Sequence, residues 1–136
     1  MTKKYHLDSL IIETITTKLS GIQAIYRYGS AGSIYERPES DIDIAILAAH
    51  IVPYYKIINL ASTLMGATGR DIDLQDMQKL PVTLRVQIVL QGERIYCADR
   101  VAAETYDSHT LSEYVRLNEE RHLILKDIQQ RERIYG

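Results

Sequence analysis

The fold of this chain is decided by the stretch Ser40-Asp41-Ile42-Asp43-Ile44-Ala45-Ile46-Leu47. Side chains alternate between the two faces of a β-strand, so Asp41 and Asp43 share one face and the isoleucines occupy the other. The last four residues of the stretch are apolar on both faces, which is typical of a strand buried in the middle of a sheet. The sequence therefore predicts a central strand whose acids lie at the end nearest the preceding loop. A solvated strand edge is the alternative interpretation.

A Gly29-Ser30 pair precedes this strand, with a gap of ten residues between Ser30 and Asp41. The pair ends an apolar, β-branched run, Ile22–Tyr28, where the chain must turn. Glycine there lets the backbone approach a phosphate, while amides and the serine hydroxyl donate hydrogen bonds to its oxygens. Taken alone the pair favours a plain turn, because Gly-Ser pairs are common in turns, and only its spacing to the acids changes the interpretation to phosphate binding.

A third acidic residue follows in a second alternating run, residues 70–75. Asp71 and Asp73 share a face of this predicted strand. Asp73 is the better candidate, because Ile72 and Leu74 flank it and are expected to bury it. Asp71 lies beside the turn at Gly69 and is expected to be solvated or paired with Arg70.

The three acids, Asp41, Asp43 and Asp73, are predicted to form a metal site. Ionised carboxylates about 4 to 5 Å apart repel by roughly 3 to 4 kcal/mol per pair at an effective dielectric near 20. Protonation can offset this repulsion, and so can a hard divalent cation with oxygen ligands. Magnesium typically takes one or two carboxylates together with substrate phosphates. The pattern therefore favours Mg²⁺ and a nucleoside triphosphate.

Length and composition limit the class of protein further. The 136 residues fit one domain, and the net charge of −2 gives no general attraction for nucleic acid, so no direct nucleic-acid binding is expected. Cys97 is the single cysteine, the start Met1-Thr2-Lys3-Lys4 leads into no apolar signal region, and no apolar run approaches the roughly 20 residues of a membrane span. We expect a cytoplasmic protein without membrane association.

The remaining patterns predict helices and strands around these runs. Helices are expected over residues 8–20, from Pro53 to Gly66 or Gly69, and from Pro81 to Gly92, with a short strand at residues 94–97. A long amphipathic helix is expected over residues 110–135, with one side facing inward: Leu111, Tyr114, Val115, Leu125 and Ile128. That apolar side is either core or a docking face. The order of elements predicts an α/β or α+β fold with a small mixed sheet flanked by helices.

These residues resemble a known family. Gly29-Ser30, the ten-residue gap, Ser40-Asp41-Ile42-Asp43 and Ile72-Asp73-Leu74 look like the minimal nucleotidyltransferases (MNT) of the polymerase-beta superfamily. The likeness extends through residues 80–85 and 92–96, so it covers a nucleotidyltransferase core at residues 20–97 and leaves residues 98–136 as a helical extension. The remainder of the chain resembles the antitoxins of two-gene HEPN/MNT toxin–antitoxin modules, in overall size and character more than in any motif.

The resemblance implies both a reaction and a partner. An antitoxin of this kind uses ATP and two Mg²⁺ ions to place AMP on a tyrosine of a HEPN RNase toxin. By this analogy Asp41, Asp43 and Asp73 are catalytic and metal-binding, and Gly29 and Ser30 hold the nucleotide. Many members carry an arginine soon after the Gly-Ser pair, where this chain has residues Ala31-Gly32-Ser33. Arg27 and Arg37 are the candidates to replace it.

Two other functions fit the same residues. The superfamily also includes enzymes that transfer a nucleotide to a small molecule, but only about 39 residues follow Cys97, fewer than a separate substrate domain would need. A non-catalytic antitoxin could instead neutralise its partner by binding through the C-terminal helix.

Overall fold

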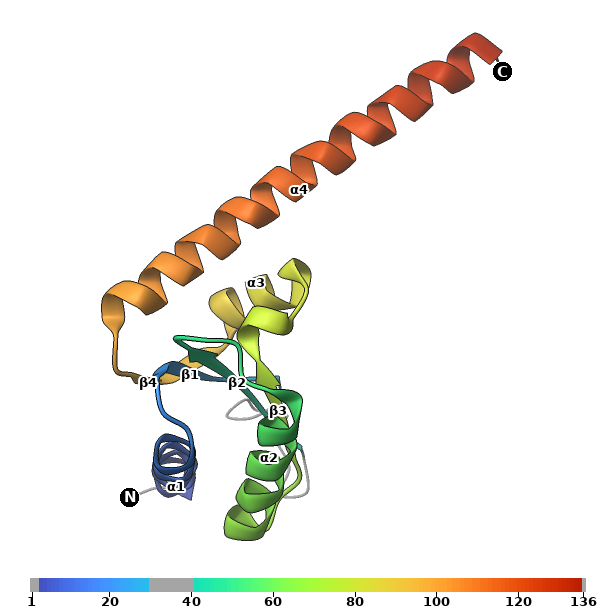
Figure 1. Ribbon diagram of the computed structural model, residues 1–136. Coiled ribbons are helices and arrows are strands. Elements are labelled where there is room, and N and C mark those ends of the chain that lie inside the picture. Colours follow the sequence, from blue (N-terminus) through green and yellow to red (C-terminus); the bar gives the residue numbers. More distant parts are fainter. Residues whose placement is uncertain (1–2, 30–40, 136) are drawn as a thin grey trace.

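The computed structural model describes residues 3–29 and 41–135, and Figure 1 shows their arrangement. In chain order the elements are α1 (Lys3–Lys18), β1 (Ile22–Tyr28), β2 (Ile42–Ala48), α2 (Tyr54–Thr68), β3 (Ile72–Asp76), the 3₁₀ turn η1 (Met77–Lys79), α3 (Val82–Gln91), β4 (Glu93–Cys97) and α4 (Arg100–Tyr135). The predicted mixed α+β fold is confirmed, and β1 spans the residues predicted for it. Both α2 and α3 follow the prolines expected to start them.

The four strands form one sheet in the order β3-β2-β1-β4. The strand β1 is antiparallel to both β2 and β4, while β2 and β3 run parallel. The acidic strand β2 is thus central, as its apolar pattern predicted. Because β2 and β3 run parallel, both strands start at the same end of the sheet, and the acidic residues of both runs lie at that end.

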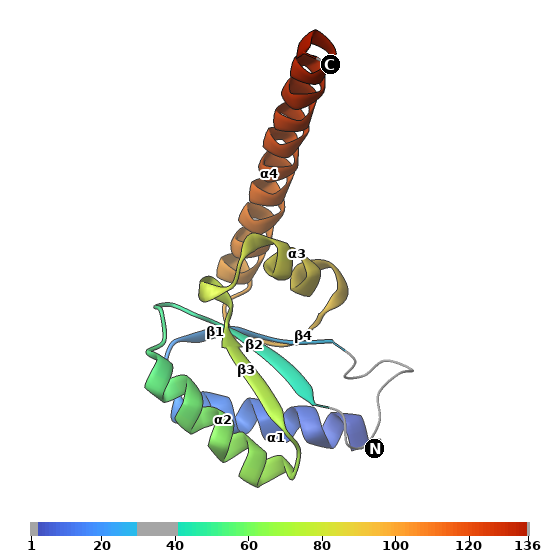
Figure 2. The same ribbon diagram turned by 90° about the vertical axis from the view of Figure 1, so that its right-hand side faces the viewer.

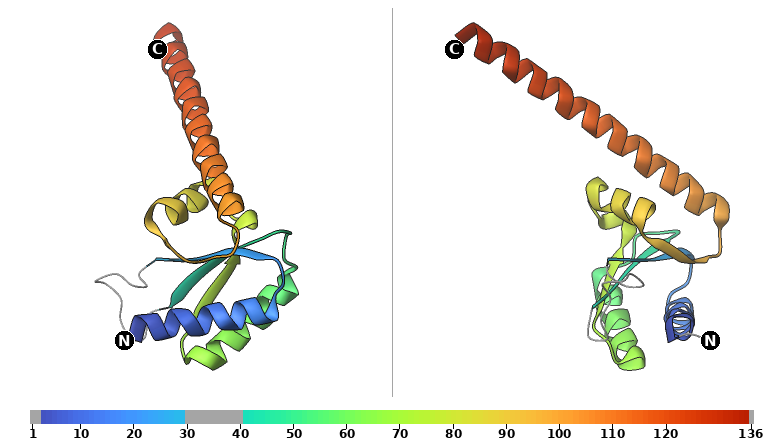
Figure 3. Two further views of the ribbon diagram at one scale, coloured as in Figure 1. Left: turned by 90° about the vertical axis from the view of Figure 1, so that its left-hand side faces the viewer. Right: turned by 180° about the vertical axis from the view of Figure 1, so that it is seen from behind.

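Helices cover both faces of the sheet (Figures 2 and 3). On one face α1 and α2 pack on the isoleucines of β2, in a core cluster that includes Ile11, Ile15, Ile42, Ile44, Ile46, Leu60 and Leu64. On the other face α3 and α4 pack on a smaller cluster that includes Ala24, Tyr26, Ala45, Leu47, Met77, Ile88 and Ala103. The alternation of β2 therefore assigns Asp43 to the α3 and α4 side, because its isoleucine neighbours point toward α1 and α2.

A buried arginine joins α1 to the sheet and links β1 to its neighbour β4. Arg27 in β1 is 3% exposed and donates from Nη1 to Asp8 of α1 at 2.8 Å and from Nη2 to Glu93 of β4 at 2.6 Å. A buried guanidinium needs such partners, because leaving it unpaired costs several kcal/mol. The guanidinium of Arg27 is therefore held in the fold by these two carboxylates, so Arg27 does not take the place of the arginine expected after the Gly-Ser pair. Arg37, the other candidate, lies outside the described residues.

The long helix α4 begins ten residues earlier than predicted, at Arg100 rather than Thr110. Its start is capped by Asp99, whose Oδ1 accepts a hydrogen bond from the Ala102 amide at 3.0 Å. Tyr106 then donates to the Met77 carbonyl at 3.1 Å and Asp107 accepts from the Tyr26 hydroxyl at 2.9 Å. The first third of α4 is thereby docked on the domain.

Beyond this docked part α4 projects away from the domain (Figure 1). The predicted inward position is wrong for Val115, Leu125 and Ile128, which are 60%, 60% and 45% exposed. At 100° per residue the docked face continues into the projecting half as an apolar stripe. We call this the α4 stripe, and it consists of Leu117, Ile124, Leu125 and Ile128. None of the described helices is long and apolar enough to cross a membrane.

Candidate active site

The strand register aligns three polar side chains in one row. Tyr28 of β1 pairs with Asp43 of β2, and Asp43 pairs with Asp73 of β3. Residues opposite one another in neighbouring strands project from the same face of a sheet. The row therefore places a phenol and two carboxylates side by side on the face that α3 covers.

Gly29 makes room for this row. Its φ is +71°, a left-handed conformation that residues with a Cβ adopt at a cost. A Cβ built at this position would also overlap Oδ2 of Asp43. The sequence predicted that this glycine lets backbone approach a phosphate. In the structure its missing side chain leaves space for the Asp43 carboxylate.

The electrostatics of the row show that negative charge is crowded there. Burial, and then the neighbouring charges of Asp73 and Asp41, raise the pKa of the Asp43 carboxyl above its ordinary value. Burial, followed by the Asp73 and Asp43 charges, likewise raises the pKa of the Tyr28 phenol, which therefore stays protonated at neutral pH. A cation bound at these carboxylates would relieve the repulsion between them.

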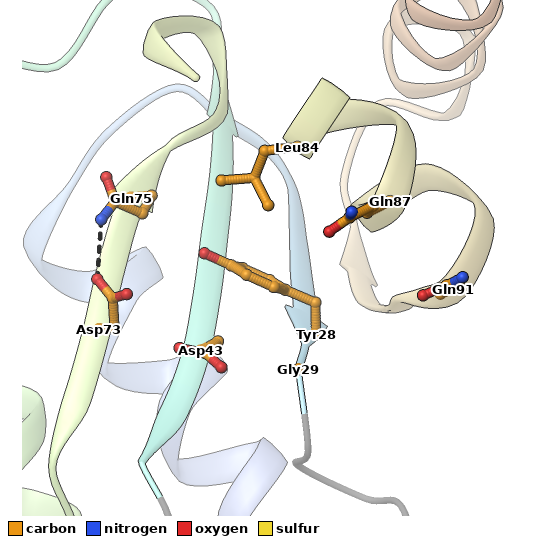
Figure 4. Close-up of a pocket in the computed structure, with 8 residues that line it drawn as sticks. All are labelled: Tyr28, Gly29, Asp43, Asp73, Gln75, Leu84, Gln87 and Gln91. Atoms are coloured by element: carbon orange, nitrogen blue, oxygen red, sulfur yellow. Dashed lines mark hydrogen bonds between the residues drawn. The ribbon is translucent and has the colours of Figure 1, made fainter. Parts of the chain in front are cut away.

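The row opens into a pocket of about 340 Å³, within the range of small-molecule sites. It is lined by Tyr28, Gly29, Asp43, Asp73, Gln75, Leu84, Gln87 and Gln91, and Figure 4 shows these residues around the hollow. Gln75 donates from its side-chain nitrogen to Oδ1 of Asp73 at 2.8 Å, which orients that carboxylate.

Five of the lining residues were not predicted from the sequence: Tyr28, Gln75, Leu84, Gln87 and Gln91. The sequence positions of Tyr28 and Gln75 could have indicated a role in the site, since each lies on a strand one or two residues from a predicted site residue. The two glutamines of α3 carry a weaker one, an i, i+4 polar pair on an amphipathic helix. Their approach to the acids depends on how α3 folds over the sheet.

The other residues predicted for the site differ in their exposure and in whether they line the pocket. Asp41 is exposed and precedes β2, near enough to influence the pKa of Asp43 but outside the pocket lining. Asp73 lines the pocket, yet the prediction that its neighbours bury it is wrong, because it is exposed. Ile72 and Leu74 point to the opposite face of β3 and so cannot cover it. Asp71 is exposed, as expected. Ser30 lies outside the described residues.

Of the three carboxylates predicted to converge, the structure places two, those of Asp43 and Asp73, opposite one another at the pocket. Across residues 3–29 and 41–135, no group of three His, Cys, Asp or Glu side chains is close enough to hold a metal ion. Asp43 and Asp73 in adjacent register still fit Mg²⁺, which is usually held by one or two carboxylates and completed by substrate phosphates and water. The pocket beside them offers space for such phosphates.

A further acid, Asp76, is excluded from the site by its contacts. It is 2% exposed, and its carboxylate accepts hydrogen bonds from the Val52 amide at 2.9 Å and the Gln78 amide at 3.0 Å. These bonds hold the loop before α2 and the turn after β3 in place, so the role of Asp76 is structural.

The mixed sheet places acids from two parallel strands beside a glycine turn. These acids face a pocket that is large enough for phosphates. This arrangement defines a nucleotidyltransferase type of site. The chain also matches the family described as Polymerase beta, Nucleotidyltransferase over residues 11–101, well over half its length. The chain belongs to this family, as the resemblance predicted, and it is a nucleotidyltransferase.

Among nucleotidyltransferases, the chain is similar to protein adenylyltransferases and to the antitoxins of toxin–antitoxin complexes. Protein adenylyltransferase MntA of Shewanella oneidensis is 31% identical over 121 residues, which are 89% of this chain and 86% of that protein. The structure of a tri-AMPylated Shewanella oneidensis HEPN toxin in complex with MNT antitoxin matches with a TM-score of 0.77 at 30% identity, covering 93% of this chain and 98% of that one. A toxin–antitoxin structure with AMP-PNP matches with a TM-score of 0.79 at 31% identity, covering 90% and 98%.

Proposed function

We propose that this protein transfers AMP from ATP to a tyrosine of a HEPN RNase toxin and so inactivates it, acting as the antitoxin of the pair. The observation that carries the proposal is the register of Asp43 with Asp73 at a phosphate-sized pocket. The similar proteins support the choice of nucleotide and acceptor, because one is called a protein adenylyltransferase and another is an antitoxin bound to an AMPylated HEPN toxin. The cytoplasm, which supplies ATP and magnesium, is the proposed location.

The residues of the row have distinct roles in this proposal. Asp43 and Asp73, with Asp41 beside them, would hold Mg²⁺. The bound ion would neutralise charge on the triphosphate and acidify the acceptor hydroxyl. The acceptor oxygen attacks the α-phosphorus of ATP, the bond from that phosphorus to pyrophosphate breaks, and pyrophosphate leaves. The hydroxyl proton passes to the Asp73 carboxylate, which Gln75 holds in position. Gly29 and Ser30 would bind the phosphates.

A protein acceptor is supported by the α4 stripe. Its residues Ile124, Leu125 and Ile128 are 60%, 60% and 45% exposed on a helix that projects from the domain. An apolar helix face of this kind is typical of a surface that another protein covers. Binding through this face could also neutralise the toxin without catalysis, and it is compatible with AMP transfer.

Intact-mass spectrometry of the partner tests the proposal. The purified chain, incubated with ATP, Mg²⁺ and its cognate HEPN toxin, should add one or more AMP units to the toxin. The double variant Asp41→Ala with Asp43→Ala should add none, whereas Asp71→Ala, which removes a nearby exposed acid, should retain transfer. A toxin that stays unmodified with the wild-type chain would contradict AMP transfer. Toxin that is still neutralised by the double variant would identify binding alone as sufficient.

A further inference from the structure

A second hollow adjoins the active-site pocket at the open edge of the sheet. It lies between α2 and β3, and its lining includes Tyr54 and Ile58 of α2, Asp73 and Gln75 of β3, and Lys79. Asp73 and Gln75 line the active-site pocket as well. The two hollows therefore meet at the carboxylate that we assign to the acceptor hydroxyl.

The open edge of β3 suits an extended polypeptide. In the part of the chain that the structure describes, β2 is the strand that pairs with β3, and the outer side of β3 carries no further strand (Figure 2). Such an edge presents backbone N–H and C=O groups that can pair with an added strand. The groove beside it offers apolar contacts, since Tyr54 is 71% and Ile58 is 49% exposed on its α2 side.

Lys79, which follows β3 in the chain, also lines this groove, and its Nζ donates to the Val52 carbonyl at 2.6 Å. A segment that lies in the groove therefore runs along β3 from Lys79 toward Asp73 and the active-site pocket. A side chain of the segment can enter the site from the β3 side while the nucleotide occupies the pocket under α3. This separation lets donor and acceptor approach the same carboxylate from different directions.

We propose that the groove between α2 and the outer edge of β3 binds an extended segment of the acceptor protein and presents its hydroxyl side chain to Asp73. This inference rests on the proposed transfer of AMP to a protein. It adds an acceptor-binding site and makes Tyr54 and Ile58 determinants of acceptor specificity. Neither residue lines the active-site pocket, so neither is needed to bind the nucleotide.

Steady-state AMP transfer at saturating ATP, with varied toxin concentration, tests this site. Ile58→Asp and Tyr54→Ala should each raise the KM for the toxin by about tenfold or more, with kcat and the thermal stabilisation by Mg²⁺ and ATP unchanged. Tyr55→Ala is the matched control, because Tyr55 is 63% exposed on the same helix turn but lies outside the groove lining. Ile58→Val, which keeps an apolar side chain at this position, should leave the KM for the toxin at the wild-type value. Unchanged KM values in the groove variants, or an equal rise in the control, would overturn the proposal.

Hydrogen exchange separates failure of this proposal from failure of the proposed function. Toxin binding should slow amide exchange in β3 and in the first turn of α2 of the wild-type chain, whether or not AMP is transferred. Protection there without any AMP on the toxin would overturn the proposed reaction and leave the groove as a binding site. Transfer of AMP without protection of β3 would overturn the groove and leave the reaction intact.

Discussion

Replacing Asp43 with Asn should stabilise the metal-free protein and remove its response to Mg²⁺. Neighbouring strands lie about 4.8 Å apart, so charges on the paired residues Asp43 and Asp73 repel by about 0.9 kcal/mol in water and about 3.5 kcal/mol at an effective dielectric of 20. Because Asp73 is exposed, the screened end of this range applies, and we expect a gain of about 1 kcal/mol. For a domain of this size that gain raises Tm by about 3 °C.

The dependence of stability on pH gives the same prediction a second test. The folded pKa of Asp43 is raised, so between its unfolded pKa of about 3.9 and its folded pKa the folded state binds more protons, and stability falls as pH rises. The destabilising contribution is complete above the folded pKa and disappears below the unfolded one. The asparagine amide in Asp43→Asn cannot titrate, so the variant should lose this part of the pH dependence.

Differential scanning calorimetry with and without Mg²⁺ is the assay. Wild-type protein should gain Tm with Mg²⁺, Asp43→Asn should start higher and gain none, and the exposed Asp71→Asn control should behave as wild type. A lower Tm in metal-free Asp43→Asn, or an undiminished gain with Mg²⁺, would show that the carboxylate pair neither repels nor binds the cation as argued.

Three further predictions concern the fold and the partner surface. Gly29→Ala should destabilise the protein by about 2 kcal/mol in urea unfolding and reduce AMP transfer, because positive φ and overlap with the neighbouring carboxylate both penalise a Cβ; a neutral effect would refute the tight fit. Ile124→Asp should abolish co-elution with the toxin while Leu123→Asp, equally exposed but off the α4 stripe, should not; equal effects would remove the stripe as an interface. Asp8→Ala should cost about 3 kcal/mol by unpairing buried Arg27 in part, and a loss below about 1 kcal/mol in thermal unfolding would contradict that role.

The sequence predicted those parts of the fold that local patterns determine. β1 over residues 22–28 and the helices after Pro53 and Pro81 follow from β-branched runs and from proline and glycine at helix ends. The predicted start of α4 is ten residues too late, although Asp99 is an N-cap residue type before an Ala-rich turn. The first residues of α4 lack a clear apolar period, so the sequence predicts a helix only from the point where the period becomes regular.

The acids of the candidate site could be named from sequence, but their geometry could not. Which residue of β3 stands beside Asp43 depends on strand register, and a shift by one residue would place Asp73 on the other face. The pairing of Tyr28 with Asp43 likewise depends on the antiparallel register of β1. The predicted burial of Asp73 is wrong because its sequence neighbours in the strand cover the opposite face.

Crystals grown with Mn²⁺ and a non-hydrolysable ATP analogue would measure the central claim most directly, since anomalous scattering locates the manganese. Our account predicts an anomalous peak at coordination distance from carboxylate oxygens of both Asp43 and Asp73, with the α-phosphate among its ligands. A nucleotide bound with no ion at this pair, or an ion held elsewhere on the molecule, would contradict it.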